Sequence, residues 1–191
     1  MEFLEHIDRS LLLLINGFHS PFFDFLWSEI SKTRTDILIY ALIIYYLFRH
    51  NSFLRGLYLL IALIVCIALA DIISVHAFKN VFERYRPSHN LEIQDMLHFV
   101  HGYRGGLYGF VSSHAANLFA FATFVSRIIP NKPLVIASFV WACLGSYSRM
   151  YLGVHYPSDI LGGALLGIII SLVIYAIFSK SDIGNTSMQK M

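Results

Sequence analysis

Long apolar runs constrain the fold of this chain more than any other feature of its sequence. A helix that crosses a bilayer needs about 20 consecutive, mostly apolar residues. Four stretches meet that need, 53–78, 112–129, 133–151 and 159–178, and a fifth at 35–49 is shorter but strongly apolar. The sequence therefore predicts an all-α fold, a polytopic membrane helix bundle with about five spanning helices.

The composition supports lipid as the solvent of these runs. Of the 191 residues, 57% are hydrophobic and 14% are charged, whereas soluble proteins carry roughly 25% charged residues. One small core could not remove so much apolar surface from water, so we expect the lipid bilayer to be a partner of the chain. The net charge of +2 is too small to favour nucleic acid as a partner.

The apolar runs divide the chain into three parts. Residues 1–34 are apolar but broken by an Asn-Gly and a Ser-Pro pair. We predict two short helices here that lie at or dip into the membrane interface, with a single broken span as the alternative. Residues 35–178 form the predicted transmembrane domain, and the polar residues 179–191 are predicted to be a C-terminal tail.

The distribution of basic residues predicts how the bundle is oriented. Cytoplasmic loops of membrane proteins carry an excess of lysine and arginine. The basic residues near the short connections are Arg49, Arg55, Arg127, Lys132 and Lys180. We therefore expect these connections to be cytoplasmic, and the segments 79–111 and 152–158 to face the periplasmic or extracellular side of a plasma (inner) membrane.

The polar residues of the outward side fall into three clusters: one follows the run 53–78, one opens the run 112–129, and one lies between the runs 133–151 and 159–178. Their members are Lys79 and Arg86, then Ser112, Ser113 and His114, and finally Arg149, His155 and Asp159. Because successive helices fold back and forth, all three clusters reach the same membrane surface. The topology therefore predicts one site built from all of them.

Five of these residues predict a phosphate-binding cradle. Lys79, Arg86 and Arg149 have too few acidic neighbours in the sequence to neutralise them, and arginine presents planar, forked donors that match phosphate oxygens. Ser112 and Ser113 open a helix, where unpaired backbone N–H groups and the helix dipole favour an anion. The alternative is that the arginines anchor the helices to lipid headgroups.

His155 and Asp159 have the spacing of a nucleophile and its supporting carboxylate. The sequence Tyr-Pro-Ser-Asp at 156–159 predicts a helix start, with proline at the first helical position. From there the Asp159 carboxylate can reach one ring nitrogen of His155, fix the tautomer and leave the other nitrogen nucleophilic. The alternative is that Asp159 only caps the helix, although capping needs no histidine four residues earlier.

His114 is predicted to be the complementary general acid. Breaking a phosphate ester requires a proton at the leaving oxygen, and the same histidine could later take a proton from an attacking water. Phosphoryl transfer otherwise depends on positioning and charge stabilisation, which the cations supply. We therefore predict no bound metal and no other cofactor.

At these residues the sequence resembles the type 2 phosphatidic acid phosphatase (PAP2) superfamily, and in particular its small bacterial membrane lipid phosphatases. The family's motifs are Lys-x6-Arg-Pro, Pro-Ser-Gly-His and Ser-Arg-x5-His-x3-Asp. The first is complete from Lys79 and the third is complete from Ser148, whereas the second reads Val-Ser-Ser-His at 111–114. The resemblance covers about residues 35–178.

The resemblance implies a role for each matching residue. The positions of His155 and His114 are those of the family's nucleophile and acid. The phosphate-binding positions are Lys79, Arg86, Ser112, Arg149 and the backbone of Ser113. Serine replaces the family's glycine at Ser113, which keeps the N–H donor and adds only a small side chain, so we expect activity to survive.

Hydrolysis of a lipid phosphate or diphosphate through a phosphohistidine is therefore the expected function. The resemblance suggests undecaprenyl diphosphate, phosphatidylglycerophosphate, phosphatidic acid and lipid A as substrate classes. Two alternatives stay open: a phosphotransferase in which a lipid alcohol replaces water, and a membrane protein that binds phospholipids without catalysis. The sequence leaves the oligomeric state open.

Three further features carry weaker hypotheses. His98 and His101 have a spacing that could suit a metal, although no third ligand is evident. Gly163 and Gly167 form a small-residue stripe that fits packing inside the bundle as well as dimerisation. Arg104 lies in the long outer segment and is hypothesised to touch a second phosphate or a sugar of the substrate, so that Arg104→Ala would raise KM for a natural substrate more than for a small soluble ester.

Overall fold

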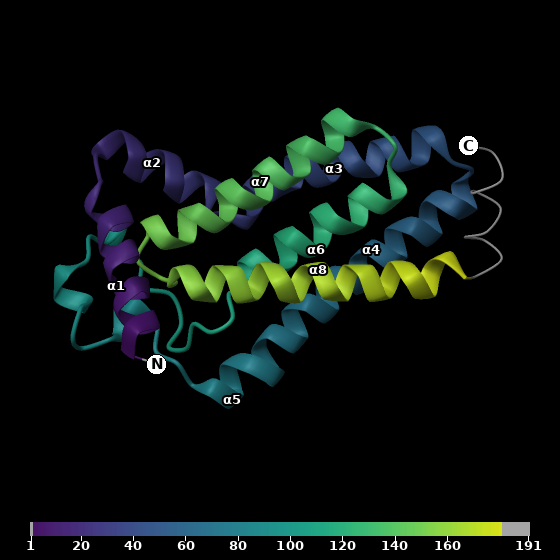
Figure 1. Cartoon of the computed structure of the whole chain (residues 1–191). Helices are drawn as coiled ribbons and strands as arrows, with labels where there is room; N and C mark the ends of the chain where they lie inside the picture. Colours follow the sequence, from purple (N-terminus) through teal and green to yellow (C-terminus); the bar gives the residue numbers. More distant parts are fainter. Residues whose placement is uncertain (1, 181–191) are drawn as a thin grey trace.

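The computed structural model describes residues 2–180 of the chain, and most of these residues are helical (Figure 1). Within that part the chain forms no strand, and its β-type pairing is limited to an isolated antiparallel bridge between Tyr85 and Tyr108. The prediction of an all-α fold is confirmed. The predicted tail at 179–191 lies, from residue 181 on, outside the described residues.

All five predicted apolar runs form helices. In chain order the helices are α1 (Glu2–Gly17), α2 (Pro21–Ile30), α3 (Thr33–His50), α4 (Phe53–Ile73), α5 (Asn80–Phe82), α6 (Ser113–Ile128), α7 (Lys132–Tyr151) and α8 (Pro157–Ser179). The long runs correspond to α3, α4, α6, α7 and α8. The N-terminal region forms α1 and α2 as two separate helices, as the Ser-Pro break predicts.

The helix that begins as α4 carries one irregular turn where it reaches the polar end of the bundle. Residues Ser74–Lys79 form a π-helical turn that joins α4 to α5, so the helix runs without a break over Phe53–Phe82. Glu83 ends it in the left-handed region, with φ of 46°. Single π turns inside α-helices occur often at functional sites, and here the turn ends at Lys79.

The segment between α5 and α6 closes on itself at its base. The Arg86 N–H donates to the Leu107 carbonyl (3.0 Å), and the Gly109 N–H donates to the Arg84 carbonyl (2.8 Å). Between these bonds lie three short 3₁₀ turns, Pro87–His89, Gln94–Met96 and Val100–Gly102. The closure fixes the start of the loop, with its two arginines, against the first residues of α6.

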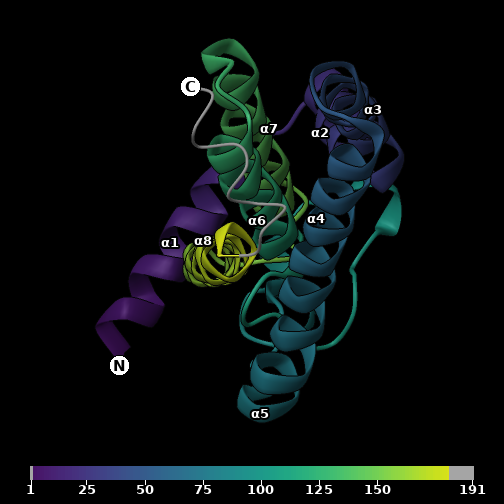
Figure 2. The ribbon, with the colours of Figure 1, turned by 90° about the vertical axis from the view of Figure 1, so that its right-hand side faces the viewer.

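Helix α6 lies at the centre of the bundle, packed against α4, α7 and α8 (Figure 2). Small residues allow the closest of these approaches. A Cβ atom at Gly163 of α8 would lie 2.4 Å from the Ser112 carbonyl oxygen, and one at Gly167 would lie 2.2 Å from the Ala116 carbonyl oxygen. The small-residue stripe of α8 therefore faces α6 inside the bundle.

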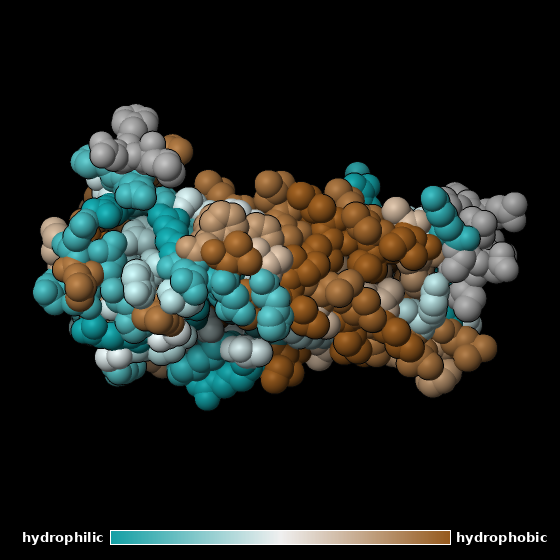
Figure 3. All heavy atoms as spheres, turned by 90° about the horizontal axis from the view of Figure 1, so that it is seen from below, coloured by the Kyte–Doolittle hydropathy of each residue, from teal (hydrophilic) through white to brown (hydrophobic). Residues whose placement is uncertain are grey.

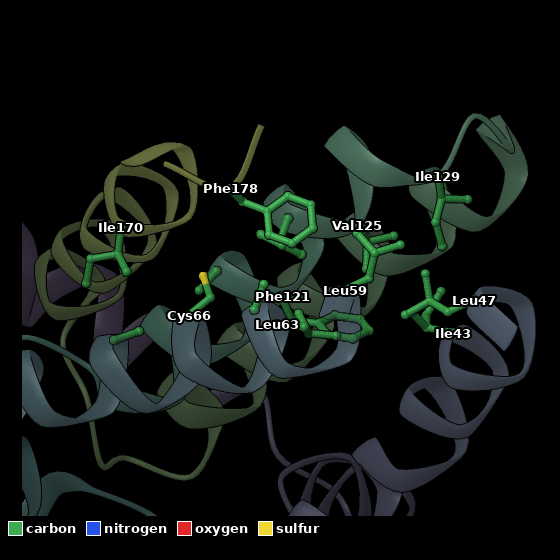
Figure 4. Packing of buried hydrophobic residues seen from close by; sticks show 14 of the residues in the cluster. Ile43, Leu47, Leu59, Leu63, Cys66, Phe121, Val125, Ile129, Ile170 and Phe178 are labelled. Atoms are coloured by element: carbon green, nitrogen blue, oxygen red, sulfur yellow. The ribbon is translucent and has the colours of Figure 1, made fainter. Parts of the chain in front are cut away.

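The largest cluster of buried apolar residues joins four of the long helices (Figure 4). Its members include Ile43 and Leu47 of α3, Leu59, Leu63 and Cys66 of α4, Phe121 and Val125 of α6, and Ile170 and Phe178 of α8. Their interdigitation, rather than exclusion of water, holds helices together when the surroundings are themselves apolar. This cluster serves to hold the helices in place.

The outer surface of the bundle is largely apolar. Hydrophilic residues gather at the end that carries α1 and the outer loop, the segment between α5 and α6, and hydrophobic residues cover most of the rest of the face in Figure 3. Large apolar side chains project outward from several helices, among them Leu38, Leu54 and Leu161, each more than 70% exposed. Apolar surfaces of this extent mark contact with another molecule or with a membrane.

The prediction of five spans is not confirmed. Among residues 2–180, two helices, Phe53–Phe82 and Pro157–Ser179, are long and apolar enough to cross a membrane. Helix α6 has 16 residues, which corresponds to about 24 Å, less than the roughly 30 Å of a hydrocarbon core. Because its neighbours bury it, α6 can carry polar residues such as His114 and Asn117. The span count therefore stays a prediction.

The N-terminal helices pack on the polar end of the bundle. Helix α1 contacts α7 and α8, and α2 contacts α7 and α3. Asn16 is 1% exposed, and its side-chain amide donates to the Tyr151 carbonyl (2.7 Å) and to the His98 carbonyl (2.9 Å). Asn16 thus ties α1 to α7 and to the outer loop. The position of α1 and α2 relative to a membrane surface stays a prediction.

Candidate active site

The three polar clusters meet at one end of the bundle, where α6 and α8 begin and α7 ends (Figure 1). The Lys79 ammonium donates to the Ser113 hydroxyl at 2.5 Å, which joins the first cluster to the second. The Ser112 backbone N–H donates to the Asp159 carbonyl at 2.9 Å, which joins the second to the third. The structure therefore brings together the residues that topology predicts to converge.

His155 and Asp159 are in contact and almost wholly buried. The Nδ1 atom of His155 lies 3.3 Å from Oδ2 of Asp159, and the two residues are 2% and 0% exposed. A carboxylate at this ring nitrogen selects the tautomer in which Nδ1 carries the proton and Nε2 offers its lone pair. The pair has the geometry of an oriented nucleophile.

Asp159 also caps α8. Its Oδ2 atom accepts the backbone N–H of Tyr156 at 2.9 Å, and Tyr156 is the N-cap residue of that helix. Capping and the contact with His155 are therefore not alternatives, because the same carboxylate oxygen serves both. The cap fixes where the carboxylate lies, and this position in turn fixes the imidazole ring.

The surroundings of His155 favour the neutral ring. Burial and the positive charges of Arg86, Arg149 and Lys79 hold the pKa of His155 well below its ordinary value of 6.5. Each of these effects penalises a protonated imidazole, and together they outweigh the attraction of Asp159. The neutral imidazole is the nucleophilic form of histidine. A phosphate group that binds beside it would supply the negative charge that the site lacks.

Two buried nitrogen atoms of the site have no hydrogen-bond partner within residues 2–180. They are Nε2 of His114 and Nε of Arg149. Leaving a buried polar group unpaired costs about 1–3 kcal/mol, so such atoms mark a place where a ligand or water belongs. Both belong to residues that the sequence predicts to act on a phosphate.

The site carries more positive than negative charge. Within the described part of the chain, Lys79, Arg86 and Arg149 form no ion pair with a carboxylate, and Asp159 instead pairs with Arg84 at 2.9 Å. Arg86 and Arg149 are each only 8% exposed. Since buried charges are stable only when they are paired, this arrangement suits a doubly charged anion such as a phosphate group.

Backbone groups hold the Arg86 guanidinium in place. Its Nε donates to the Tyr108 carbonyl (3.1 Å) and its Nη1 to the Val154 carbonyl (3.4 Å). Two glycines of the outer loop make room for it: a Cβ atom at Gly105 would lie 2.8 Å from Nη1, and one at Gly109 would lie 3.2 Å from the Arg86 Cγ. Glycine at these positions lets the loop close over the arginine.

Two serines form the first turn of α6. Ser112 is the N-cap, and its hydroxyl accepts the Ala115 N–H at 3.4 Å, so it is engaged in capping as well as lying in the cluster. The hydroxyl of Ser113 lies between Ser74 (2.6 Å) and Lys79. The side chain that replaces the family's glycine therefore links α6 to the π-helical turn.

Sequence reasoning missed Arg84 and Asp8. The Arg84 guanidinium donates to Asp159 Oδ1 at 2.9 Å and to Asp8 Oδ2 at 2.8 Å. Asp8 of α1 in turn accepts the Ser158 N–H at 2.9 Å. Arg84 lies inside the first motif, at a position that the motif leaves free. The cluster around it connects α1 to the residue behind His155. The only signal in the sequence was an unassigned cation within a motif.

Two partners of Arg149 were also missed. Its Nη1 donates to the Ser31 hydroxyl, and its Nη2 donates to the Tyr103 hydroxyl at 3.0 Å. Ser31 directly follows α2 and Tyr103 lies in the outer loop, so neither falls in a motif. Their contacts orient the guanidinium so that Nε is the donor left over.

Arg104 and His98 have contacts that differ from the hypotheses about them. The Arg104 guanidinium donates to the Ser88 carbonyl (3.3 Å) and to the Gln94 side chain (3.3 Å), so it holds the outer loop together. His98 lies 2.9 Å from an Asp24 carboxylate oxygen and stacks on His19. Among residues 2–180 there is no group of three His, Cys, Asp or Glu side chains that could hold a metal.

Comparison with known proteins agrees with this site. The PAP2 superfamily profile matches residues 59–183. A lipid A 4'-phosphatase of Porphyromonas gingivalis is 34% identical over 93% of this chain and 75% of its own length. A lipid A 4'-phosphatase of Bacteroides thetaiotaomicron is 38% identical over 87% of this chain and 75% of its own length.

Two crystal structures share the fold. One is a transmembrane PAP2-type phosphatidylglycerolphosphate phosphatase from Bacillus subtilis, with a TM-score of 0.67 and 20% identity over 94% of this chain and 88% of that one. The other is Aquifex aeolicus LpxE, with a TM-score of 0.63 and 24% identity over 87% of this chain and 93% of that one.

The chain belongs to the PAP2 superfamily. It is a phosphatase of the membrane type, with the family's fold and, in the part of the chain that the structure describes, two helices apolar enough to cross a bilayer.

Proposed function

We propose that this chain hydrolyses a phosphate from a membrane lipid through a phosphohistidine formed on His155, without a metal ion. The observation that supports this most strongly is the grouping of Lys79, Arg86 and Arg149 around a neutral, carboxylate-supported His155. Binding a phospholipid would need the cations alone. A carboxylate held against a buried imidazole has a purpose when that imidazole becomes positively charged during a reaction.

In the proposed first step, Nε2 of His155 attacks phosphorus and the bond from phosphorus to the ester oxygen breaks. His114 gives its proton to that oxygen. The phosphate brings negative charge next to Nε2 of His114, which favours the protonated ring that this step requires. Arg149 and Lys79 stabilise the charge on the phosphoryl oxygens, and Asp159 stabilises the positive charge on the His155 ring.

In the second step, water attacks the phosphohistidine. His114 now takes a proton from that water, the bond between phosphorus and the His155 nitrogen breaks, and inorganic phosphate leaves. His155 returns to its neutral form, and His114 holds the proton needed for the next turnover. The two histidines therefore exchange no proton with each other. His114 gives one proton to the leaving ester oxygen in the first step and takes another from the attacking water in the second.

The relatives favour a phosphoglycolipid as the substrate class. The two lipid A 4'-phosphatases align with 93% and 87% of this chain, whereas a phosphatidylglycerophosphatase B of Haemophilus influenzae aligns with 40% of it. An undecaprenyl-diphosphatase of Sulfolobus acidocaldarius aligns with 67%. We therefore propose a lipid A-type phosphate as the preferred substrate among the four classes expected.

A panel of lipids tests the proposed function. Purified protein in detergent with excess chelator would be offered a lipid A-type phosphate, phosphatidylglycerophosphate, phosphatidic acid and undecaprenyl diphosphate. We expect release of inorganic phosphate in the presence of the chelator, because the cradle needs no metal. The highest kcat/KM should be that for the lipid A-type substrate. Enzyme-linked detection of phosphate and mass spectrometry of the lipid products provide the measurement.

Each other outcome of the panel contradicts part of the proposal. A requirement for a divalent metal contradicts the metal-independent mechanism. A new phospholipid without inorganic phosphate identifies a phosphotransferase. Saturable binding of the lipids without turnover identifies a non-catalytic binding protein.

We further propose that α3, α4, α6, α7 and α8 all cross the plasma (inner) membrane, with the active site on its outer side. The five helices lie side by side (Figure 1), so a membrane that surrounds α4 and α8 would also surround the helices packed between and beside them. The connections at the opposite end of the bundle carry Arg49, Arg55 and Lys132, as cytoplasmic connections do.

Single cysteines test this orientation. In a background with Cys66 and Cys143 replaced by alanine, we expect Gly106→Cys in the outer loop to react with an impermeant maleimide on intact spheroplasts. Ser52→Cys at the opposite end should react only after permeabilisation. Both positions tolerate a cysteine, since a Cβ at Gly106 meets nothing within 4 Å and Ser52 makes no capping bond. The reverse labelling pattern would invert the orientation.

A further inference from the structure

A cavity of about 530 Å³ lies beside the predicted phosphate-binding residues Lys79, Arg86 and Arg149, here called the phosphate cluster, and shares Arg149 with them. Ser28, Ser31 and Thr33 line it from the junction of α2 and α3, His101 and Tyr103 line it from the outer loop, and Arg149 lines it from the end of α7. Cavities of about 300–1,000 Å³ are the usual size of small-ligand sites. Arg149 is the one residue of this cavity whose identity a motif specifies, and Leu152 lies at a free position of the third motif.

Arg149 connects this cavity to the candidate active site. Its Nη1 and Nη2 atoms donate to Ser31 and Tyr103, which are wall residues of the cavity. Its Nε atom is buried without a partner in the described part of the chain, and the charge of the same guanidinium acts on His155. One guanidinium therefore borders both spaces. A phosphate bound at Nε would have the rest of its headgroup within reach of the cavity.

The walls have the chemistry of a sugar site. Ser28, Ser31, Thr33 and Tyr103 contribute hydroxyl groups, which can both donate and accept hydrogen bonds and so match the hydroxyls of a sugar ring. Tyr103 is 44% exposed, which leaves an aromatic surface available to the apolar face of such a ring.

A second phosphate fits the cavity less well. Lys32 lies in the wall, but its ammonium is paired with the Glu29 carboxylate. The Arg34 guanidinium lies 2.6 Å from the same carboxylate. The cavity thus has little free positive charge apart from Arg149, which faces the phosphate cluster. A doubly charged group placed here would lack the cations that surround His155.

We propose that this cavity binds the sugar headgroup of a phosphoglycolipid while its phosphate lies against Arg149 and His155. The inference rests on the proposed function and names the part of the substrate that the enzyme recognises. It assigns selectivity to the junction of α2 and α3, a region outside every motif. Arg104, by contrast, holds the loop from the outside and is not a wall residue of this cavity.

Filling the cavity tests the proposal. Ser28→Phe places a large ring in the space and removes only the bond from the Ser28 hydroxyl to the Phe25 carbonyl. We expect KM for a lipid A-type phosphate to rise about tenfold or more, with kcat nearly unchanged. KM for phosphatidic acid, which has no sugar, should stay within about twofold of the wild-type value.

Ser126→Phe is the matched control. Ser126 lies near the other end of α6, is similarly half-buried, and donates to the carbonyl three residues earlier, as Ser28 does. Neither KM should change in this variant. Thr33→Phe is a second way to fill the cavity from an exposed position and should reproduce the selective effect if Ser28→Phe does not fold.

Binding to a catalytically inactive protein separates the two proposals. With His155→Ala as background, Ser28→Phe should weaken equilibrium binding of the lipid A-type phosphate in mixed micelles about tenfold. Equal effects of Ser28→Phe on the lipid A-type phosphate and on phosphatidic acid, in KM or in binding, would overturn the cavity proposal. It would also be overturned if Ser28→Phe weakened binding only of a lipid A-type substrate that carries two phosphates and not of one that carries a single phosphate. Selective binding without any turnover in the wild type would overturn the proposed function and leave the sugar site standing.

Discussion

Replacing His155 by alanine is expected to lower phosphate release by about 10⁴-fold or more, because the reaction loses its nucleophile. Replacing His114 by alanine should lower it by about 10²–10⁴-fold, the usual contribution of a general acid. The loss in the His114 variant should depend on the leaving group. An ester of p-nitrophenol needs little protonation to leave and should be affected least.

Trapping of the phosphoenzyme distinguishes the two roles. After brief exposure to a ³²P-labelled aryl phosphate, the His114→Ala protein should retain label, because phosphorylation of His155 proceeds while hydrolysis lacks its base. The label should be stable in alkali and lost in acid, as a phosphorus–nitrogen bond is. The His155→Ala protein should retain none.

His50→Ala provides the matched control for both variants. His50 lies at the end of α3, away from the site, where its ring contacts Tyr46. Turnover and labelling in this variant should equal those of the wild type. Label bound covalently to the His155→Ala protein would contradict the assignment of the nucleophile.

The contacts around His155 show which parts of such a site are predictable from sequence. The reach of Asp159 to His155 follows from a four-residue spacing at a helix start, and that spacing is local. The meeting of Lys79 with Ser113 follows from the alternation of the helices, which places the ends of successive apolar runs on one side. Both inferences needed only the order of elements along the chain.

The number of spans is harder to predict from apolar runs alone. Hydropathy measures how well a helix suits lipid, but α6 is surrounded mainly by other helices. Its composition therefore reflects its neighbours, including His114 at its start. The same burial explains why a helix of 16 residues occupies the centre of the bundle. A central helix has no direct requirement to match the bilayer.

The N-terminal residues of the site could not be predicted, because nothing local connects them to it. Asp8 contacts Ser158 across 150 positions of sequence, and Ser31 contacts Arg149 across 118. These contacts depend on how α1 and α2 pack against α7 and α8. Helix α1 is amphipathic, but an amphipathic pattern indicates only which face of a helix is apolar. It does not indicate which distant residue each polar side chain of that helix contacts.

Arg84 is a residue whose role is visible only in the structure. Its replacement should impair catalysis, although Arg84 is not among the residues predicted to contact the phosphate. Its guanidinium pairs with Asp159, which is 0% exposed, and with Asp8 of α1. Removing one partner of a buried ion pair costs about 3–5 kcal/mol. We expect Arg84→Ala to lower kcat about 10²-fold, with little change in KM, because Asp159 no longer holds the His155 ring.

Arg9→Ala and Arg84→Lys are the controls for this prediction. Arg9 also belongs to the region where α1 meets the outer loop, but it pairs with Glu92 at the surface. Exposed pairs contribute about 0–1 kcal/mol, so its loss should change kcat less than about twofold. Arg84→Lys keeps the charge near Asp159 and should recover part of kcat.

Chemical rescue separates a positioning role from a merely structural one. Arg84 lines an open cavity of about 560 Å³ together with Arg9 and Tyr156, so the Arg84→Ala protein would have a vacated site that a guanidinium ion can enter from solvent. Millimolar guanidinium, far below denaturing concentrations, should restore kcat of Arg84→Ala at least about tenfold and leave Arg9→Ala and His155→Ala unchanged. If Arg84→Lys and guanidinium both failed to restore kcat while Arg84→Ala remained folded at the assay temperature, Arg84 would not act through Asp159. Restoration would mean that the cation behind the carboxylate, and not the covalent link to the chain, is what orients His155 for attack.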